Sequence, residues 1–420
     1  MKLTIHPSEV SGNVVAPPSK SMTQRAIAAG LLSEGLTRIL NPSVCNDSLA
    51  ALQMAYDLGA GTEMKANEWL IQPGNKPRQQ ELKCGESGLA MRMFAPIASL
   101  SDEPVTFTGK GSLNKRPVTM ISDALSQLGV DFRSNQGYLP FVLKGPLQGG
   151  HAVIDGSISS QLLTGLLIAL PLTRMDTTLD VIHLKSKPYI EMTLQLLGDF
   201  GIDIQHQNLE KFFIKGNQKY LPRDYLIEGD WSNAAFLLVA GAIGGQIVVS
   251  GLKTDSYQAD RKIVSALSQA GAKLQLFEDS IHVTKDALVA FHFDATDSPD
   301  LFPPLAVLAA NCKGRSVLSG VERLIHKESN RAVSIQQSLE LMGIKTQVQG
   351  NEMMIEGGTI HGAIIDPFND HRIAMMATVA ALCSSNEISL THAECVNKSY
   401  PDFYLTMKAA GAVIDQIDTP

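Results

Sequence analysis

Lysine and arginine residues recur where the sequence predicts that helices begin. In residues 16–26, APPSKSMTQRA, a proline pair precedes Lys20 and Arg25, and an apolar stretch follows. Proline cannot continue a helix from upstream, and Ser21 with Gln24 predicts a capping box. A helix N-terminus carries partial positive charge, so a cation there costs roughly 0.3–1 kcal/mol. This unfavourable placement points to a negatively charged ligand.

The same placement occurs at further predicted helix starts. The residues are Arg92, Arg116, Lys187, Lys327, Arg331, Arg372 and Lys398. One such side chain usually points into water, but chance is a poor explanation for six or more helix starts. Helix N-termini present free N–H groups to anions, and arginine can hold a carboxylate or a phosphate through two parallel hydrogen bonds. The pattern therefore predicts phosphate and carboxylate groups on more than one ligand.

Hydroxyl and carboxyl side chains accompany these cations. Ser159, Ser160 and Gln161 stand at another predicted helix start, where they could cap the helix or orient a polyol phosphate. Asp300 precedes an apolar helix and could also be a cap. Glu328 is flanked by two of the cations, a setting that suits proton transfer but also a structural ion pair.

A repeat predicts the elements that must position these groups. In six places an amphipathic stretch ends in glycine and a short strand-like segment follows, at intervals of 68 to 72 residues. Each glycine is placed to end a helix and lead into a strand, so one supersecondary unit is used six times. Domain-size priors favour two domains of three units. We expect an α/β fold, and the segment IEGDWSNAA is the best candidate for the crossing between the two domains.

Composition narrows the class of protein. The 420 residues are 44% hydrophobic and 18% charged with a net charge of -7, which predicts a globular chain and argues against a general nucleic-acid or anionic-membrane binder. No apolar signal segment opens the sequence, and the apolar stretch 234–252 is interrupted by polar residues and glycines. Five cysteines without C-x-x-C spacing favour the reducing cytoplasm and predict neither disulfides nor a metal site. A P-loop motif is also absent.

Eight motifs in order strongly resemble the 5-enolpyruvylshikimate-3-phosphate synthase family. They are PPSKSMTQRA, NKRPV, SISSQ, SKPYI, EGDWSNAA, HKESNR, NDHRIAMM and NKSYPDF. The resemblance implies a two-lobed enolpyruvyl transferase fold, each lobe built from three βαβαββ repeats around a helical bundle. One lobe would be formed by residues 1–16 and 230–420 and the other by residues 17–229. It implies transfer of the enolpyruvyl group of phosphoenolpyruvate to the 5-hydroxyl of shikimate 3-phosphate, through a tetrahedral intermediate that expels phosphate. No cofactor is implied, and we expect a monomeric enzyme.

The resemblance also implies site residues. Catalysis would rest on Asp300 as the base for the hydroxyl, Glu328 as the acid at the methylene, and Lys20 in support. Shikimate 3-phosphate would contact Lys20, Ser21, Arg25, Ser159, Ser160, Gln161, Ser186, Asp300, Arg323 and Lys327. Phosphoenolpyruvate would contact Lys20, Gly88, Arg116, Gln161, Arg331, Arg372 and Lys398.

The chain departs from the family pattern at several positions. Glu86, Ser87, Gly88 and Leu89 stand where Asn-Ala-Gly-Thr is usual, and Met93 where proline commonly follows the arginine. Arg323 replaces a common asparagine, and Asn330 a frequent aspartate. Two alternatives stay open. A sibling enzyme that transfers enolpyruvyl to UDP-N-acetylglucosamine usually has a cysteine in the loop that reads GKGSLNKR here, and a non-catalytic phospho-ligand-binding protein would not need Asp300 and Glu328 together.

Overall fold

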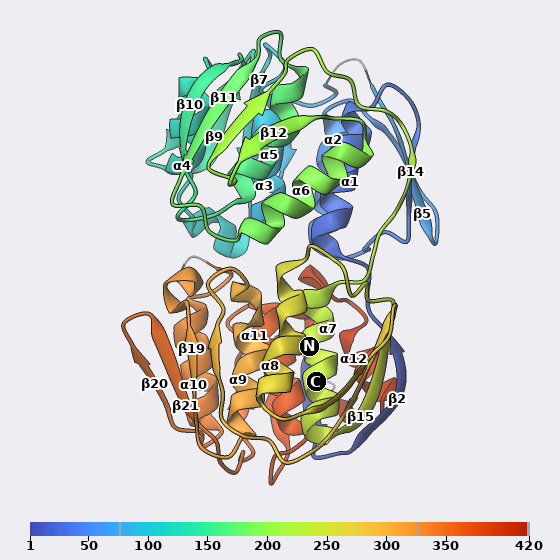
Figure 1. The fold of residues 1–420 in the computed structure, drawn as a ribbon, viewed down its shortest axis with the longest axis vertical. Helices are drawn as coiled ribbons and strands as arrows, with labels where there is room; N and C mark the ends of the chain where they lie inside the picture. The colour runs from blue at the N-terminus through green and yellow to red at the C-terminus, as the bar shows by residue number, and fades with distance from the viewer. Residues whose placement is uncertain (75–76, 326, 418–420) are drawn as a thin grey trace. The chain divides into compact units, whose positions relative to one another are not determined.

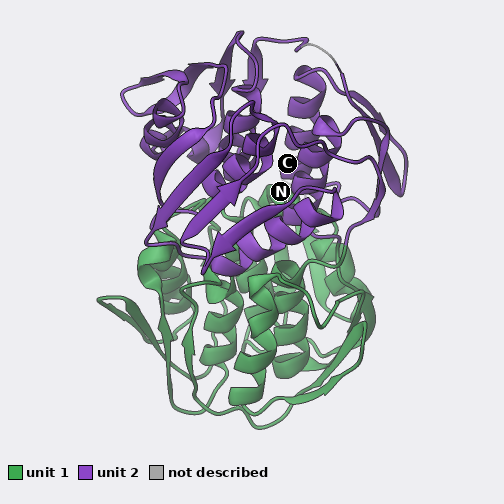
Figure 2. Ribbon diagram, turned by 45° about the horizontal axis from the view of Figure 1, so that its top comes forward, with its two compact units in different colours: residues 1–17, 228–420 green, residues 18–227 purple. Residues whose placement is uncertain are grey.

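The chain folds into two compact units. The computed structural model describes residues 1–74, 77–325 and 327–417, and Figure 1 shows the course of the chain. Unit 1 comprises Met1–Pro17 and Glu228–Pro420, and unit 2 comprises Pro18–Ile227 (Figure 2). The boundaries expected from the sequence, after residue 16 and before residue 230, lie within two residues of these. Unit 2 is thus one continuous segment, inserted between the two segments of unit 1.

Within residues 1–74, 77–325 and 327–417, each unit contains three four-stranded sheets, and all six sheets share one topology. Two parallel strands lie at one side of the sheet, and the other two strands continue it in antiparallel order. One helix follows the first strand and a second helix follows the second strand, which gives the order βαβαββ. This is the repeat that the family resemblance implies, and it recurs at the interval of the glycines.

In unit 2, two repeats are continuous in sequence. The third combines elements from the start of the segment with a strand from its end. The split repeat is α1 (Lys20–Leu32), β3 (Thr37–Leu40), α2 (Asn46–Asp57), β4 (Gly61–Met64) and β5 (Glu68–Gln72), completed by β14 (Asp224–Leu226) beside β3. The next is β6 (Glu81–Lys83), α3 (Gly88–Ala98), β7 (Pro104–Thr108), α4 (Thr119–Gln127), β8 (Asp131–Asn135) and β9 (Tyr138–Lys144). The last is β10 (Gly150–Asp155), α5 (Gln161–Ala169), β11 (Thr177–Ile182), α6 (Lys187–Asp199), β12 (Ile204–Gln207) and β13 (Lys211–Ile214).

Unit 1 is assembled from both ends of the chain. Its first repeat is β2 (Val10–Val15), α7 (Trp231–Gly244), β15 (Gly245–Ser250), α8 (Ile263–Gln269), β16 (Lys273–Leu276) and β17 (Ser280–Thr284). The second is β18 (His292–Asp294), α9 (Phe302–Ala310), β19 (Arg315–Ser319), α10 (Arg331–Leu341), β20 (Thr346–Gln349) and β21 (Glu352–Glu356). The third is β22 (Ile364–Ile365), α11 (His371–Ala381), β23 (Ile388–Leu390), α12 (Phe403–Ala409) and β24 (Val413–Ile417), with β1 (Lys2–His6) inserted between β23 and β24.

The two helices of a repeat differ in burial because they differ in sequence. Every residue of α3, α9 and α11 is buried, as expected for helices that are apolar on all sides. The second helices bury one face only; in α4 this face consists of Ile121, Ala124 and Leu125. The first helices therefore form the interior of each unit, and each unit has its own hydrophobic core.

The six glycines of the sequence repeat have the predicted role. Gly59, Gly129, Gly201, Gly271, Gly343 and Gly411 each follow the C-cap of a second helix and have φ between 80° and 116°. A residue with a side chain is strained in this left-handed region, whereas glycine is not. The interval of about 70 residues is thus the interval between helix-to-strand joints.

Two local expectations are settled by the structure. The apolar stretch 234–252 forms most of α7 and all of β15, and no helix among the described residues is long and apolar enough to cross a membrane. The expected capping box in α1 is wrong: Ser19 rather than Ser21 is the N-cap, and its hydroxyl accepts the Met22 N–H at 3.4 Å. The helix begins one residue before Ser21, because Ser19 is the first hydroxyl residue after the prolines.

Candidate active site

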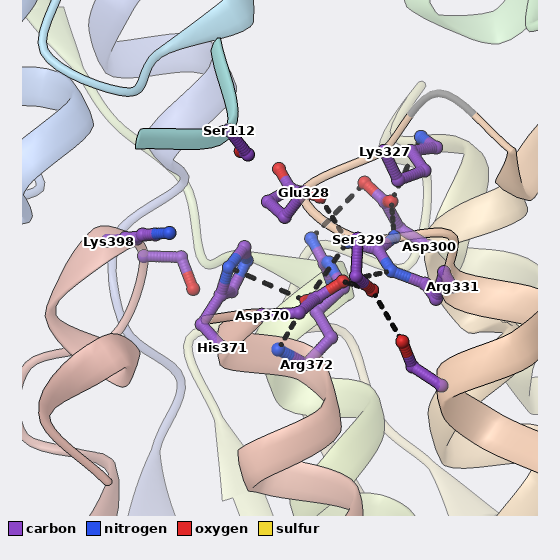
Figure 3. Close-up of polar contacts among 12 residues, drawn as sticks. Ser112, Asp300, Lys327, Glu328, Ser329, Arg331, Asp370, His371, Arg372 and Lys398 are labelled. Carbon is purple, nitrogen blue, oxygen red and sulfur yellow. Dashed lines mark hydrogen bonds and ion pairs between the residues drawn. The ribbon is translucent and has the colours of Figure 1, made fainter. Parts of the chain in front are cut away.

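In unit 1 a buried ion pair joins the N-terminal ends of two helices (Figure 3). Arg331 is the first residue of α10 and is fully buried. Its Nε donates to Oδ2 of Asp370 at 2.9 Å and its Nη2 to Oδ1 at 3.2 Å. Asp370 is the N-cap of α11, where it accepts the backbone N–H of Arg372 at 3.0 Å. The bidentate pair therefore fixes the starts of α10 and α11 against each other.

Asp300 contacts three cations, one from each of the helices α10 and α11 and one from the loop before α10. It lies in the short 3₁₀ helix η4 (Pro299–Leu301), just before α9. Its Oδ1 accepts Arg331 Nη1 at 2.7 Å and Lys327 Nζ at 3.2 Å, and its Oδ2 accepts Arg372 Nη2 at 3.2 Å. The Asp300 side chain is 24% exposed and that of Lys327 25%, so both are reachable from solvent, whereas Arg331 and Arg372 are almost fully buried. The arrangement can hold anionic groups and a carboxylate side by side.

Burial and the carboxylates act in opposite directions on these cations. Burial alone would lower the pKa of Arg331, but Asp370, Glu328 and Asp300 together raise it above its ordinary value. The pKa of Arg372 is likewise raised, mainly by Asp300, against the effect of burial. For Lys327 burial prevails over the attraction of Asp300 and lowers the pKa. Lys327 is therefore the cation of this group that gives up its proton most readily.

Glu328 and Lys398 complete the group at the helix starts. A carboxylate oxygen of Glu328 accepts a hydrogen bond from Nη2 of Arg331, and the Glu328 side chain is 18% exposed. Lys398, at the end of the 3₁₀ helix η6 (Ala393–Lys398), donates from Nζ to the backbone oxygen of Asn369 at 2.6 Å. Arg323 lies in the 3₁₀ helix η5 (Val321–Leu324), where burial lowers its pKa against the attraction of nearby carboxylates.

In unit 2, contacts of Lys20 and Arg25 join the helix α1 to the helices α2, α5 and α6. Lys20, the first residue of α1, donates from Nζ to Oδ2 of Asp47 in the first turn of α2 at 2.9 Å. Arg25, one turn further along α1, is 1% exposed and donates from Nε to the Thr193 hydroxyl of α6 at 2.9 Å. It also donates to the Thr164 hydroxyl of α5 at 3.3 Å. Because its partners in the described part of the chain are uncharged, burial lowers the pKa of Arg25 to about 10.

Gly88 opens α3 beside three polar side chains of unit 2. Arg92 Nη1 donates to the side-chain oxygen of Gln161 at 2.8 Å. A Cβ built on Gly88 would lie 2.7 Å from Nη1 of Arg116 and 3.1 Å from Nη1 of Arg92. A side chain at position 88 would thus displace an arginine, which explains why the helix begins on glycine.

Hydroxyl residues mark two further helix starts in unit 2. The Ser159 hydroxyl accepts the backbone N–H of Gln161 at 3.2 Å, and Ser160 is the N-cap of α5 without a side-chain capping bond. Ser186 precedes α6 with φ of 56°, a strained conformation for serine. Ser21, in the first turn of α1, is partly exposed.

The cations do not depend on a ligand alone for a negatively charged partner. Lys20, Arg331 and Arg372 pair with Asp47, Asp370 and Asp300 within the chain. Nor does Asp300 cap α9, which begins at Phe302 after Leu301 without a side-chain capping bond. Sequence reasoning missed Asp47 altogether and took Asp370 only as a cap. An aspartate in the first turn of a helix is common because it stabilises the positive end of the helix dipole. Nothing in the sequence therefore marks it as a partner of a distant lysine.

The family model and the relatives that match this chain point to one protein family. The family model described as EPSP synthase (3-phosphoshikimate 1-carboxyvinyltransferase) matches residues 5–407. A 3-phosphoshikimate 1-carboxyvinyltransferase from Methanocorpusculum labreanum is 38% identical over 418 residues, which cover 98% of this chain and 99% of that protein. One from Clostridium novyi is 34% identical over 427 residues, which cover 99% and 98%.

Solved structures show the same fold. An EPSP synthase from Acinetobacter baumannii superposes with a TM-score of 0.83 at 27% identity and covers 99% of this chain and 100% of that one. The enolpyruvyl transferase NikO from Streptomyces tendae has a TM-score of 0.82 at 18% identity, with coverage of 100% and 99%. The second likeness concerns the fold alone.

Proposed function

The chain belongs to the EPSP synthase family, and we propose that it transfers the enolpyruvyl group of phosphoenolpyruvate to the 5-hydroxyl of shikimate 3-phosphate. The products are 5-enolpyruvylshikimate 3-phosphate and phosphate. The observation that carries this proposal is Asp300, a partly exposed carboxylate held by three cations at the helix starts of unit 1. Such a group offers a base and several anion-binding donors in one place.

The binding residues are proposed from the family resemblance. For shikimate 3-phosphate they are Lys20, Ser21, Arg25, Ser159, Ser160, Gln161, Ser186, Asp300, Arg323 and Lys327. For phosphoenolpyruvate they are Lys20, Gly88, Arg116, Gln161, Arg331, Arg372 and Lys398. The contacts among Gly88, Arg116 and Gln161 support their assignment to one ligand, because a Cβ on Gly88 would meet both side chains.

The reaction proceeds by addition and elimination. Asp300 accepts the proton of the 5-hydroxyl as its oxygen attacks the enol carbon, and Glu328 delivers a proton to the methylene, which becomes a methyl group. The tetrahedral intermediate then loses phosphate, and the methyl group loses a proton to restore the double bond. Lys20 assists the proton transfers, and the surrounding cations stabilise the departing phosphate.

Competition for the cations can prepare the two carboxyl groups for these roles. Arg331 donates to both Asp300 and Glu328, and its positive charge favours their ionised forms. An anionic substrate competes for the same donors and adds negative charge nearby. Both effects raise the proton affinity of Asp300 and Glu328, which makes the first a stronger base and allows the second to carry a proton.

The two alternatives are less well supported. The relatives with full-length similarity are 3-phosphoshikimate 1-carboxyvinyltransferases, which favours shikimate 3-phosphate over UDP-N-acetylglucosamine as the acceptor. A silent phospho-ligand-binding protein would have no use for a partly exposed Asp300 and Glu328 beside one arginine. We further propose a monomeric cytoplasmic enzyme without metal or organic cofactor.

An assay of the purified protein tests the function. With phosphoenolpyruvate, shikimate 3-phosphate and EDTA present, we expect stoichiometric phosphate and enolpyruvylshikimate 3-phosphate by ³¹P NMR. Asp300→Asn and Glu328→Gln should lower kcat by roughly 10²–10⁴-fold, the contribution of a general acid or base, with a much smaller effect on KM. Phosphate release that depends on UDP-N-acetylglucosamine instead, or that is absent from a folded protein, would reject the proposal.

A further inference from the structure

A fully buried carboxyl group of unit 1, that of Asp260, interacts electrostatically with Asp300. Asp260 is in the 3₁₀ helix η3 (Ala259–Lys262), and none of its surface is exposed. One of its carboxylate oxygens accepts a hydrogen bond from the hydroxyl of Ser232, in the first turn of α7. The neighbouring Arg261 points elsewhere and donates to the backbone oxygen of Thr254. A carboxyl group is seldom buried so completely unless it is paired or hydrogen-bonded.

A chain of contacts leads from Asp260 to the proposed base. Ser232, which donates to Asp260, offers its backbone oxygen to Nη1 of Arg372 at 3.5 Å. The other terminal nitrogen of Arg372 donates to Oδ2 of Asp300 at 3.2 Å. The Arg372 guanidinium is therefore held between α7 and Asp300. A change at Asp260 therefore reaches Asp300 through two residues, Ser232 and Arg372.

The charges around Asp260 make its ionisation responsive to this site. Burial above all, and then the negative charge of Asp300, raise the pKa of Asp260 to about 7. Asp230, the N-cap of α7, acts in the same direction, whereas Arg372 and the hydrogen bond from Ser232 favour the ionised form. These are the charged groups that face it from α7, η4 and α11. Asp260 thus changes charge within the range of neutral pH.

We propose that Asp260 is a positioning residue for the transfer reaction, which through Ser232 and Arg372 sets the orientation and basicity of Asp300. The inference rests on the proposed function of Asp300. When Asp260 is ionised, its charge opposes ionisation of Asp300 and competes for the attraction of Arg372. Both effects increase the affinity of Asp300 for the 5-hydroxyl proton. When Asp260 is protonated, Arg372 attracts Asp300 undiminished and Asp300 is the weaker base.

The pH dependence of turnover is the first test. For the native protein, kcat/KM for shikimate 3-phosphate should rise with pH through an apparent pKa near 7, because Asp300 is the stronger base once Asp260 is ionised. The rise should be roughly threefold if proton transfer is half complete in the transition state. Asp260→Asn keeps the size of the side chain but cannot ionise, so this rise should be absent. Substrate ionisation contributes equally to both proteins and is removed by the comparison. An unchanged rise in Asp260→Asn would overturn the proposal.

Ser232→Ala provides a second variant with a different expected outcome. It removes the hydrogen bond that favours ionised Asp260, so the rise should move to higher pH rather than disappear. A merely structural contact would lower the rate at every pH without moving the midpoint, and that result would count against the proposal. The variant also decides the question if Asp260→Asn does not fold.

A measurement that needs no turnover separates this inference from the proposed function. In ¹³C NMR of carboxyl-labelled protein, the Asp300 signal, assigned through Asp300→Asn, should show a second step where Asp260 titrates. Asp260→Asn should abolish that step. If the native protein releases no phosphate but shows the step, the proposed function fails and the coupling stands. If it is active and shows no such step, the inference about Asp260 fails alone.

Discussion

Arg331 and Arg25 are both buried arginines near helix starts, but their charges are balanced in different ways. Arg331 faces Asp370, Asp300 and Glu328, whereas Arg25 donates to hydroxyl and backbone oxygens. The sequence shows both only as cations in an unfavourable place. Which of them has a carboxylate partner depends on contacts between residues far apart in the chain, and spacing along the sequence does not reveal these.

This difference predicts opposite effects on stability. Arg331→Met should lower the free energy of unfolding by roughly 3–5 kcal/mol, because it leaves Asp370 buried without its cation. Arg25→Met should leave stability unchanged or improve it, since it removes a buried charge that has no anionic partner among the described residues, and the Thr164–Thr193 hydrogen bond at 3.2 Å can persist. Urea denaturation measures both, and each variant should lose turnover. Equal stability of the two variants would contradict this interpretation.

At the scale of elements, the repeat could be predicted because it depends on local chemistry. The glycine at each helix-to-strand joint is required by its own backbone conformation, so it recurs in the sequence wherever the joint recurs. The side-by-side arrangement of α10 and α11 could not be predicted in this way. It depends on the Arg331–Asp370 pair, whose members belong to different repeats.

Two glycines provide a matched test of the joint. Gly271 has φ of 83° and room for a methyl group, with its nearest neighbour 3.4 Å from an added Cβ. Gly271→Ala should therefore cost about 1–2 kcal/mol through backbone strain alone. Gly198, inside α6, also has room but an ordinary helical conformation, so Gly198→Ala should stabilise by roughly 0.5–1 kcal/mol. Thermal unfolding of the two variants checks the contrast, and similar effects of both would refute it.

Helix α3 carries a prediction about inhibition. Glyphosate inhibits this family at the phosphoenolpyruvate site, and Leu89 and Met93 are buried one turn apart in the helix that begins with Gly88. They stand where threonine and proline are usual, so we expect weaker inhibition than in relatives with those residues. Leu89→Thr combined with Met93→Pro should lower the inhibition constant. An unchanged constant in a variant that remains folded and active would remove the basis for this expectation.

At the scale of the whole molecule, the chain ends complete the fold of unit 1. Strand β1 is an inner strand of its sheet, with Ile5 paired to Ile388 on one side and Ile414 on the other. The composition and the repeat period indicate two domains of three repeats, but not that the first strand of the sequence completes the last repeat. That closure brings together residues about four hundred positions apart, which no local pattern encodes.

Because each unit has its own hydrophobic core, a destabilising substitution in β1 should lower the stability of unit 1 but not of unit 2. Ile5 is fully buried, so Ile5→Asn should cost roughly 3 kcal/mol or more. Hydrogen–deuterium exchange should then accelerate in β23 and β24 while α3 and α5 of unit 2 stay protected. Lys2→Asn, at a partly exposed position of the same strand, serves as the control. Equal loss of protection in both units would show that they do not unfold separately.

The central claim is that this chain joins its two substrates by addition and elimination, with a proton delivered to the methylene carbon. Reaction in D₂O followed by mass spectrometry of the product tests this most directly. Addition and elimination should give enolpyruvylshikimate 3-phosphate with deuterium in its vinyl group, because the methylene becomes a methyl group that includes one solvent deuteron before a proton is lost. Glu328→Gln should slow formation of this labelled product. Product without vinyl deuterium, or no product from the folded protein, would show that the chain does not transfer the enolpyruvyl group by addition and elimination.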